Sequence, residues 1–188
     1  MDRPISRFPV PELADLPEDL RERILAVQEK SGFVPNVFLV LAHRPDEARA
    51  FFDYHDALML RDGGLSAAEK EMIVVATSAA NDCVYCVVAH GAILRIRAKD
   101  PHVADQVATN WRKADLTDRQ RAILRFALRV ATDSASIEEG HLDELRAHGI
   151  DDEDIWDIGA IAGLFALSNR MANLTSMAPN AEFFTLGR

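Results

Sequence analysis

Both cysteines of this 188-residue chain lie in the segment NDCVYCVVAH, residues 81–90, only three positions apart. His90 follows Cys86 by four residues, so on a helix Cys83, Cys86 and His90 would share one face. The thiolate is the reactive form of cysteine, and a helix N-terminus or a neighbouring imidazolium favours it. The spacing favours a reactive thiol pair, while a disulfide staple, a metal site and a chance pairing stay open at this point.

Asp82 is expected to be the N-cap of the helix that carries both cysteines. Aspartate is a preferred N-cap residue because its side-chain oxygen accepts a hydrogen bond from a free backbone N–H of the first turn. Cys83 would then be the first helical residue, and Cys86 would follow one turn later. This places both sulfur atoms at a helix N-terminus, where the dipole stabilises negative charge.

Glu71 is the acidic residue that we expect to face this cluster. It precedes Cys83 by twelve residues, where the preceding predicted helix changes from polar to apolar, and residues 72–76 behind it are all apolar. A carboxylate there would be partly desolvated, which is an environment suited to proton transfer. Packing of the two helices as a hairpin would let Glu71 face the cysteines and His90.

Glu69 has a different predicted role. Residues 65–80 (LSAAEKEMIVVATSAA) align with residues 116–131 (LTDRQRAILRFALRVA). The two segments match at the first leucine, at the Ser or Thr that would cap the helix, at the Glu or Gln three residues later and at the apolar positions behind it, which suggests a duplicated helical unit. Glu69 falls on a glutamine, as expected for a capping box in both helices, whereas Glu71 falls on Ala122. The helix therefore needs Glu69 for its start but does not need a carboxylate at position 71.

The whole chain has the pattern of an all-α protein. No alternating apolar run is bounded by hairpin turns. Four prolines in residues 1–17 predict an extended N-terminal arm, and residues 18–188 are expected to form a single domain. Pro45 is an expected helix start, and Gly32 and Gly149 are expected helix stops. The expected helices cover residues 18–30, 37–42, 45–59, 65–80, 83–98, 116–131, 136–149 and 151–177.

The charge balance bears on partners and compartment. Thirty acidic residues against 21 basic ones give a net charge of -9, which disfavours nucleic acid and anionic membranes as partners. The N-terminal sequence lacks the apolar segment of a secretory signal, so we expect a cytoplasmic protein. In a reducing cytosol, a cysteine pair is more often catalytic, redox-active or metal-binding than structural.

Zinc is the main alternative to redox chemistry, because Cys83, Cys86 and His90 are three plausible ligands. A closed structural zinc site usually draws its ligands from two separated pairs, and the chain has no second Cys/His pair. No flavin or nicotinamide motif occurs either, so neither a metal nor an organic cofactor is expected. The other histidines are scattered and are expected at the surface or satisfied in the core: His43, His55, His102, His141 and His148.

The order Glu71, Cys83-x-x-Cys86, His90 resembles the core motif of the AhpD-like alkylhydroperoxidases, within the carboxymuconolactone decarboxylase superfamily. The segments GFVPNVFLVLAHRP and GIDDEDIWDIGAIAGLFALSNRMAN resemble the peroxidase-related branch, and the resemblance covers roughly residues 30–175. It implies an all-α fold assembled as trimers or hexamers, with a cysteine-based peroxidase or disulfide-reductase site. Decarboxylase members generally lack the cysteine pair, so lactone decarboxylation is not expected.

The resemblance also implies roles for the individual residues. Cys86 would be the peroxidatic cysteine and Cys83 the resolving one, with Glu71 and His90 as a proton relay. The helix N-terminus argues instead that Cys83 has the lower pKa. Some members have a histidine directly before the second cysteine, where this chain has Tyr85, a poor base near pH 7.

The leading hypothesis is a thiol peroxidase that acts on a hydroperoxide and is reduced by an external dithiol or protein disulfide reductant. Two alternatives use the same residues: a thiol–disulfide oxidoreductase without peroxidase activity, and a non-catalytic redox switch or binding protein. Glu71 favours the enzyme, since neither a switch nor a Cys/His metal site requires it.

Overall fold

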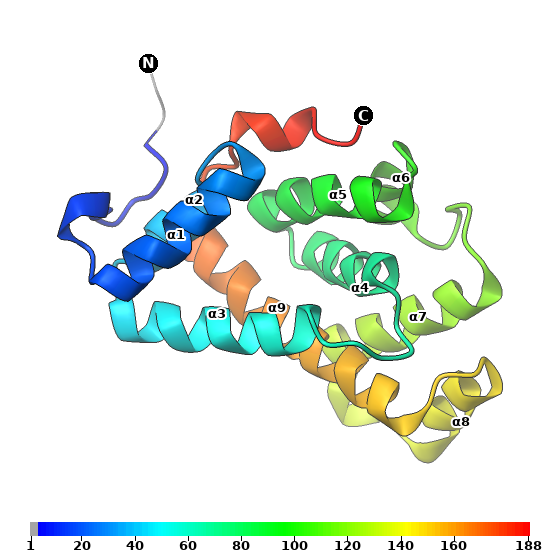
Figure 1. Ribbon diagram of the computed structural model, residues 1–188. Helices are drawn as coiled ribbons and strands as arrows, with labels where there is room; N and C mark the ends of the chain where they lie inside the picture. Colours follow the sequence, from blue (N-terminus) through cyan, green and yellow to red (C-terminus); the bar gives the residue numbers. More distant parts are fainter. Residues whose placement is uncertain (1–3) are drawn as a thin grey trace.

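The computed structural model describes residues 4–188, and all the regular secondary structure in that range is helical (Figure 1). That range contains no strand, so the all-α prediction is confirmed. The α-helices are α1 (Glu18–Ser31), α2 (Asn36–Leu41), α3 (Pro45–Met59), α4 (Ala67–Ala80), α5 (Val84–Ala98), α6 (Val103–Asn110), α7 (Asp118–Asp133), α8 (Glu139–Ala147) and α9 (Asp152–Thr175). Three short 3-10 helices are η1 (Leu13–Asp15), η2 (Ser134–Ser136) and η3 (Ala181–Phe184).

Helix α4 is the centre of the molecule and packs against α5, α6, α7 and α9 (Figure 1). Its residues 69–78 are all buried, and the continuous apolar run of residues 72–76 lies within that segment. Apolar side chains from the surrounding helices complete the main core, among them Leu94, Leu124, Ile158, Ile161 and Phe165. Within residues 4–188, no helix is both long and apolar enough to cross a membrane.

Two capping boxes begin the central helices, as the sequence predicts. At the start of α4, the Ser66 side chain accepts the Glu69 backbone N–H, and Glu69 Oε2 accepts the Ser66 backbone N–H at 2.8 Å. Thr117 and Gln120 make the same pair of bonds at the start of α7. The boxes satisfy N–H groups that have no partner within their helix, so each start is defined locally. The duplication of the two units stays a prediction.

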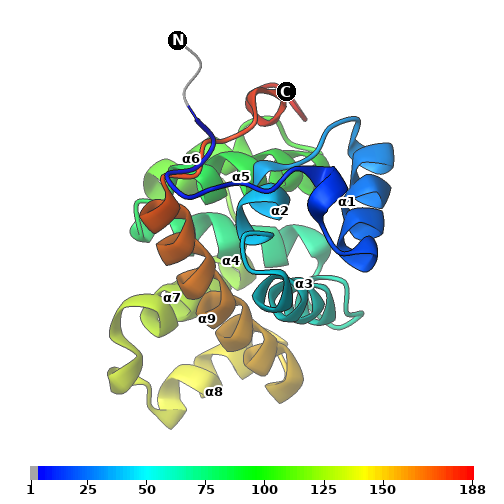
Figure 2. The same ribbon diagram turned by 90° about the vertical axis from the view of Figure 1, so that its left-hand side faces the viewer.

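Two parts of the chain differ from the expectation. The described part of the N-terminal arm is not wholly extended, because Leu13–Asp15 forms one 3-10 turn; residues 1–3 lie outside the described residues. The arm runs from the end of α9 toward α1 (Figure 2), and the Arg7 backbone N–H donates to the Thr175 carbonyl at 2.7 Å. Helix α6, which follows the loop at residues 99–102, was not predicted.

Candidate active site

The turn between α4 and α5 places both cysteines, and it corrects one prediction. Asp82 is not the N-cap of α5; it lies in the turn with φ +52, a left-handed conformation that aspartate adopts more readily than most residues. Cys83 is the N-cap instead, and its sulfur accepts the Cys86 backbone N–H at 3.3 Å. Because the chain turns sharply at Asp82, the helix begins one residue later than expected, at Val84.

The α4–α5 hairpin brings Glu71 and His90 together. His90 Nδ1 lies 2.8 Å from Glu71 Oε2, and the two side chains are only 14% and 10% exposed. Water competes little for a hydrogen bond at such burial, so the contact with Glu71 fixes the orientation of the His90 ring. With Nδ1 engaged by Glu71, Nε2 is the nitrogen left to exchange a proton with a third group.

Both thiols are buried and free, and they influence each other's ionisation. A hydrogen bond from the Cys86 side chain lowers the pKa of Cys83; burial opposes this, and the Cys86 backbone N–H and the Asn169 side chain reinforce it. The same hydrogen bond, together with burial, raises the pKa of Cys86. Of the two thiols, Cys83 therefore loses its proton first, in line with its position at the helix N-terminus.

A cavity of about 540 Å³ reaches one of the two cysteines. Cys86 and His90 both line it, whereas Cys83 is not part of its wall within the described residues. The cavity therefore gives access to Cys86, whereas Cys83 is the cysteine with the lowered pKa. A molecule bound in this cavity would meet Cys86 and not Cys83. The rest of the wall is mainly apolar and includes six phenylalanines: Phe33, Phe38, Phe51, Phe52, Phe165 and Phe183.

The family model for the carboxymuconolactone decarboxylase family matches residues 45–110, which span α3 to α6. A crystal structure described as alkylhydroperoxidase AhpD core, an uncharacterized peroxidase-related protein from Ralstonia eutropha JMP134, is 67% identical in sequence. The match covers 100% of this chain and 98% of that chain, with a TM-score of 0.99. The chain belongs to the AhpD-like carboxymuconolactone decarboxylase family.

Other solved structures show how far this AhpD-like fold extends. An uncharacterized peroxidase-related protein from Silicibacter sp. TM1040 is 41% identical, with a TM-score of 0.93 over 99% of this chain and 97% of that one. A variant of the debrominase Bmp8 in complex with 2,3,4-tribromopyrrole shares the fold at 21% identity, with a TM-score of 0.77 over 97% and 95% of the two chains. No curated protein matches the sequence.

Tyr85 holds two helices together in this AhpD-like chain. Its hydroxyl oxygen accepts the Val37 backbone N–H at 3.1 Å, which joins the start of α2 to α5. Burial raises the pKa of Tyr85, so the phenol stays protonated. Tyr85 therefore serves packing rather than proton transfer, and any relay at this site depends on Glu71 and His90.

Helix α9 contributes two polar residues that the sequence analysis did not select. Ser168 Oγ lies 3.9 Å from Cys86 Sγ. Asn169 is fully buried; its side chain donates to Ser78 Oγ at 2.9 Å and accepts from Asn81 Nδ2 at 3.0 Å. The available signal was their position, since both polar residues directly follow the apolar run IGAIAGLFAL. Together they connect α9 to the cysteine turn.

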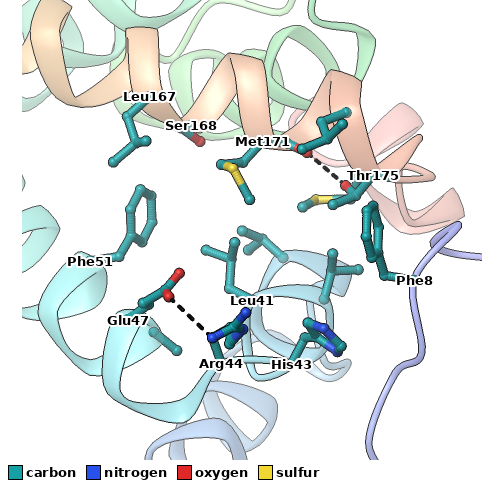
Figure 3. A pocket seen from close by; sticks show the side chains of 15 residues that line it. Phe8, Leu41, His43, Arg44, Glu47, Phe51, Leu167, Ser168, Met171 and Thr175 are labelled. Atoms are coloured by element: carbon teal, nitrogen blue, oxygen red, sulfur yellow. Dashed lines mark hydrogen bonds and ion pairs between the residues drawn. The ribbon is translucent and has the colours of Figure 1, made fainter.

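A second, smaller cavity of about 300 Å³ adjoins the first (Figure 3). Val37, Phe51 and Ser168 line both cavities and so form the wall between them. Leu41 and Met171 point into the smaller cavity, and an Arg44–Glu47 ion pair lies at its side (Figure 3). No group of three histidine, cysteine or acidic side chains is placed to hold a metal ion anywhere in residues 4–188.

Proposed function

We propose that this AhpD-like protein reduces organic hydroperoxides with its cysteine pair, Cys86 acting as the nucleophile and Cys83 as the resolving thiol. The observation that carries the proposal is that Cys86 and His90 line one apolar cavity while Glu71 contacts Nδ1 of the same His90 ring. An apolar wall suits the organic part of the substrate. A buried His–Glu pair beside a thiol suits a reaction that moves a proton.

The first step forms a sulfenic acid. His90 takes one proton from the thiol pair, and Glu71 stabilises the resulting imidazolium. The remaining proton of the pair moves to Cys83, which leaves the thiolate on Cys86, the cysteine in the cavity. This thiolate attacks the terminal oxygen of the hydroperoxide and the O–O bond breaks. The released alkoxide takes the proton from His90 and leaves as an alcohol, while Cys86 becomes a sulfenic acid.

The second step closes the disulfide. Cys83 attacks the sulfenic sulfur of Cys86, an S–S bond forms, and the hydroxide leaves as water with the proton from Cys83. Cys83 is the N-cap of α5, where the helix N-terminus favours its thiolate, and this suits the attack. An external dithiol then reduces the disulfide by exchange and restores both thiols.

Stopped-flow measurements with tert-butyl hydroperoxide test the proposed activity. The reduced protein should consume one equivalent of peroxide per chain, lose two thiols, and react much faster than free cysteine at the same pH. Cys86→Ser should lose the fast reaction, whereas Cys83→Ser should keep the first step. A parent protein that reacts no faster than free cysteine would refute the activity, and a fast Cys86→Ser variant would refute the choice of nucleophile.

The lowered pKa of Cys83 supports thiol–disulfide exchange as a second candidate function, because its first cause is the hydrogen bond from the neighbouring thiol, reinforced by the Cys86 backbone N–H at the start of α5. In that case the protein would reduce disulfide substrates with a dithiol donor but would not accelerate peroxide consumption. Comparing turnover with a small disulfide and with tert-butyl hydroperoxide under the same donor distinguishes the two functions.

A further inference from the structure

A second histidine lines the cavity that contains Cys86 and His90. His55, in α3, was expected at the surface or satisfied in the core, but it forms part of the cavity wall. Its ring and the His90 ring both meet Phe165 edge-on, with centroid distances of 6.3 Å and 4.7 Å. Two imidazoles from different helices thus approach the cavity around one aromatic ring.

The hydrogen bonds of His55 determine which of its nitrogens carries the proton. Nδ1 lies 3.0 Å from Asp56 Oδ1, and the other oxygen of Asp56 accepts from Arg23 at 2.5 Å. Burial alone would raise the pKa of Asp56, but the hydrogen bonds from His55 and Arg23 outweigh it and lower that pKa. Asp56 is therefore an ionised acceptor, so Nδ1 of His55 is the donor.

The remaining nitrogen of His55 is a free acceptor. Burial lowers the pKa of His55, so the ring is neutral near pH 7 and Nε2 carries a lone pair. Within residues 4–188, every fully buried side-chain nitrogen or oxygen has a hydrogen-bond partner. Nε2 of His55 has no partner in that range, so it cannot be fully buried. Nε2 is therefore accessible, and the space that the ring lines is the cavity.

We propose that Nε2 of His55 accepts a hydrogen bond from the O–H group of the bound hydroperoxide, which makes His55 a substrate-binding residue. This inference rests on the proposed function and deepens it. A hydroperoxide has a single donor, its terminal O–H, and within the proposed reaction the charged His90 is a donor and cannot accept it. An acceptor on the opposite helix complements His90: one ring holds the terminal O–H while the other protonates the departing oxygen.

The proposal predicts a selectivity that can be measured. His55 should assist electrophiles that carry an O–H group but not electrophiles that lack one. Two reagents that react with the Cys86 thiolate separate these cases. tert-Butyl hydroperoxide has an O–H group, whereas 4,4′-dithiodipyridine, a neutral disulfide, has none. Both require the Cys86 thiolate, so a change in thiol ionisation would affect the two reactions alike.

The experiment compares His55→Leu, which removes the acceptor, with His55→Gln, which supplies a side-chain oxygen, and with His43→Gln as a control outside this cavity. An unsatisfied buried donor costs about 1–3 kcal/mol, so His55→Leu should slow the hydroperoxide reaction about 5- to 150-fold. Its dithiodipyridine reaction should stay within about twofold of the parent. His55→Gln should recover part of the loss, and His43→Gln should match the parent in both reactions.

Two results would overturn the inference: a His55→Leu variant that reacts with hydroperoxide at the parent rate, or one that slows equally with both reagents. Failure of the proposed function looks different. The parent itself would then react with dithiodipyridine but not with hydroperoxide, before any variant is compared.

Discussion

Replacing Glu71 by glutamine tests the proton relay with the least change in shape. The amide oxygen of glutamine can still accept the His90 Nδ1–H that Glu71 accepts at 2.8 Å, but it carries no charge. A hydrogen bond to a charged group contributes about 1.5–3 kcal/mol and a neutral one about 0.5–1.5 kcal/mol, so the imidazolium loses roughly 1–2 kcal/mol of stabilisation. Because that imidazolium accompanies the reactive thiolate, the rate constant with tert-butyl hydroperoxide at pH 7 should fall about 5- to 30-fold.

Glu69→Gln is the matched control, since Glu69 lies two residues earlier on the same helix and is also buried. It accepts from the Ser66 backbone N–H and from Arg119 Nε at 3.0 Å, so its loss should lower the unfolding free energy by about 1–2 kcal/mol and leave the peroxide rate within about twofold. Stopped-flow rates and denaturant midpoints of both variants measure the two effects. A Glu71→Gln variant as fast as the parent, or equal slowing by both substitutions, would refute the relay.

Three further predictions concern chemistry, stability and pH. Cys83→Ser should accumulate a Cys86 sulfenic acid that a dimedone-type probe labels within one turnover; absence of labelling would argue against Cys83 as the resolving thiol. Lys70→Met should lower the unfolding free energy by about 1–3 kcal/mol in denaturant titrations, because buried Lys70 donates to the backbone carbonyls of Leu58, in the last turn of α3, and Arg61, just after it; an unchanged midpoint would contradict this. Burial lowers the pKa of His55 from 6.5, so below pH 6.5 the unfolded state binds a proton that the folded state does not. As the pH decreases from 6.5 to the folded-state pKa, the unfolding free energy should therefore decrease by up to about 1.4 kcal/mol per pH unit. His55→Gln should flatten that slope, and an unaltered slope would contradict the assignment.

Local signals determined which parts of the fold the sequence could predict. Capping boxes at Ser66 and Thr117 and the left-handed Gly32 at the end of α1 act within a few residues, so those helix limits were predictable. The start of α5 was wrong by one residue, because the turn at Asp82 depends on how α4 and α5 pack. The burial of Lys70 could not be predicted either, since its two acceptors lie at the end of another helix, α3, and just after it.

The residues of the candidate site also fall into those that local spacing predicted and those that it did not. The pairing of Glu71 with His90 followed from their spacing on two consecutive helices. Ser168 was not predictable from spacing, because it reaches Cys86 from 82 residues further along the chain. His55 was missed for the same reason: no pattern around a single histidine in α3 indicates that the fold turns it toward a cavity formed with α5 and α9.

The central claim is that Cys83 and Cys86 form a disulfide within one chain through a peroxide reaction at Cys86. Mass spectrometry of the fully reduced protein after one equivalent of tert-butyl hydroperoxide, quenched with a thiol-alkylating reagent, tests it directly. The expected product is a chain that is two hydrogen atoms lighter, takes up no alkylating reagent and yields one peptide pair linked at Cys83 and Cys86. Full alkylation of both cysteines after exposure to peroxide, or a disulfide only between chains, would contradict it.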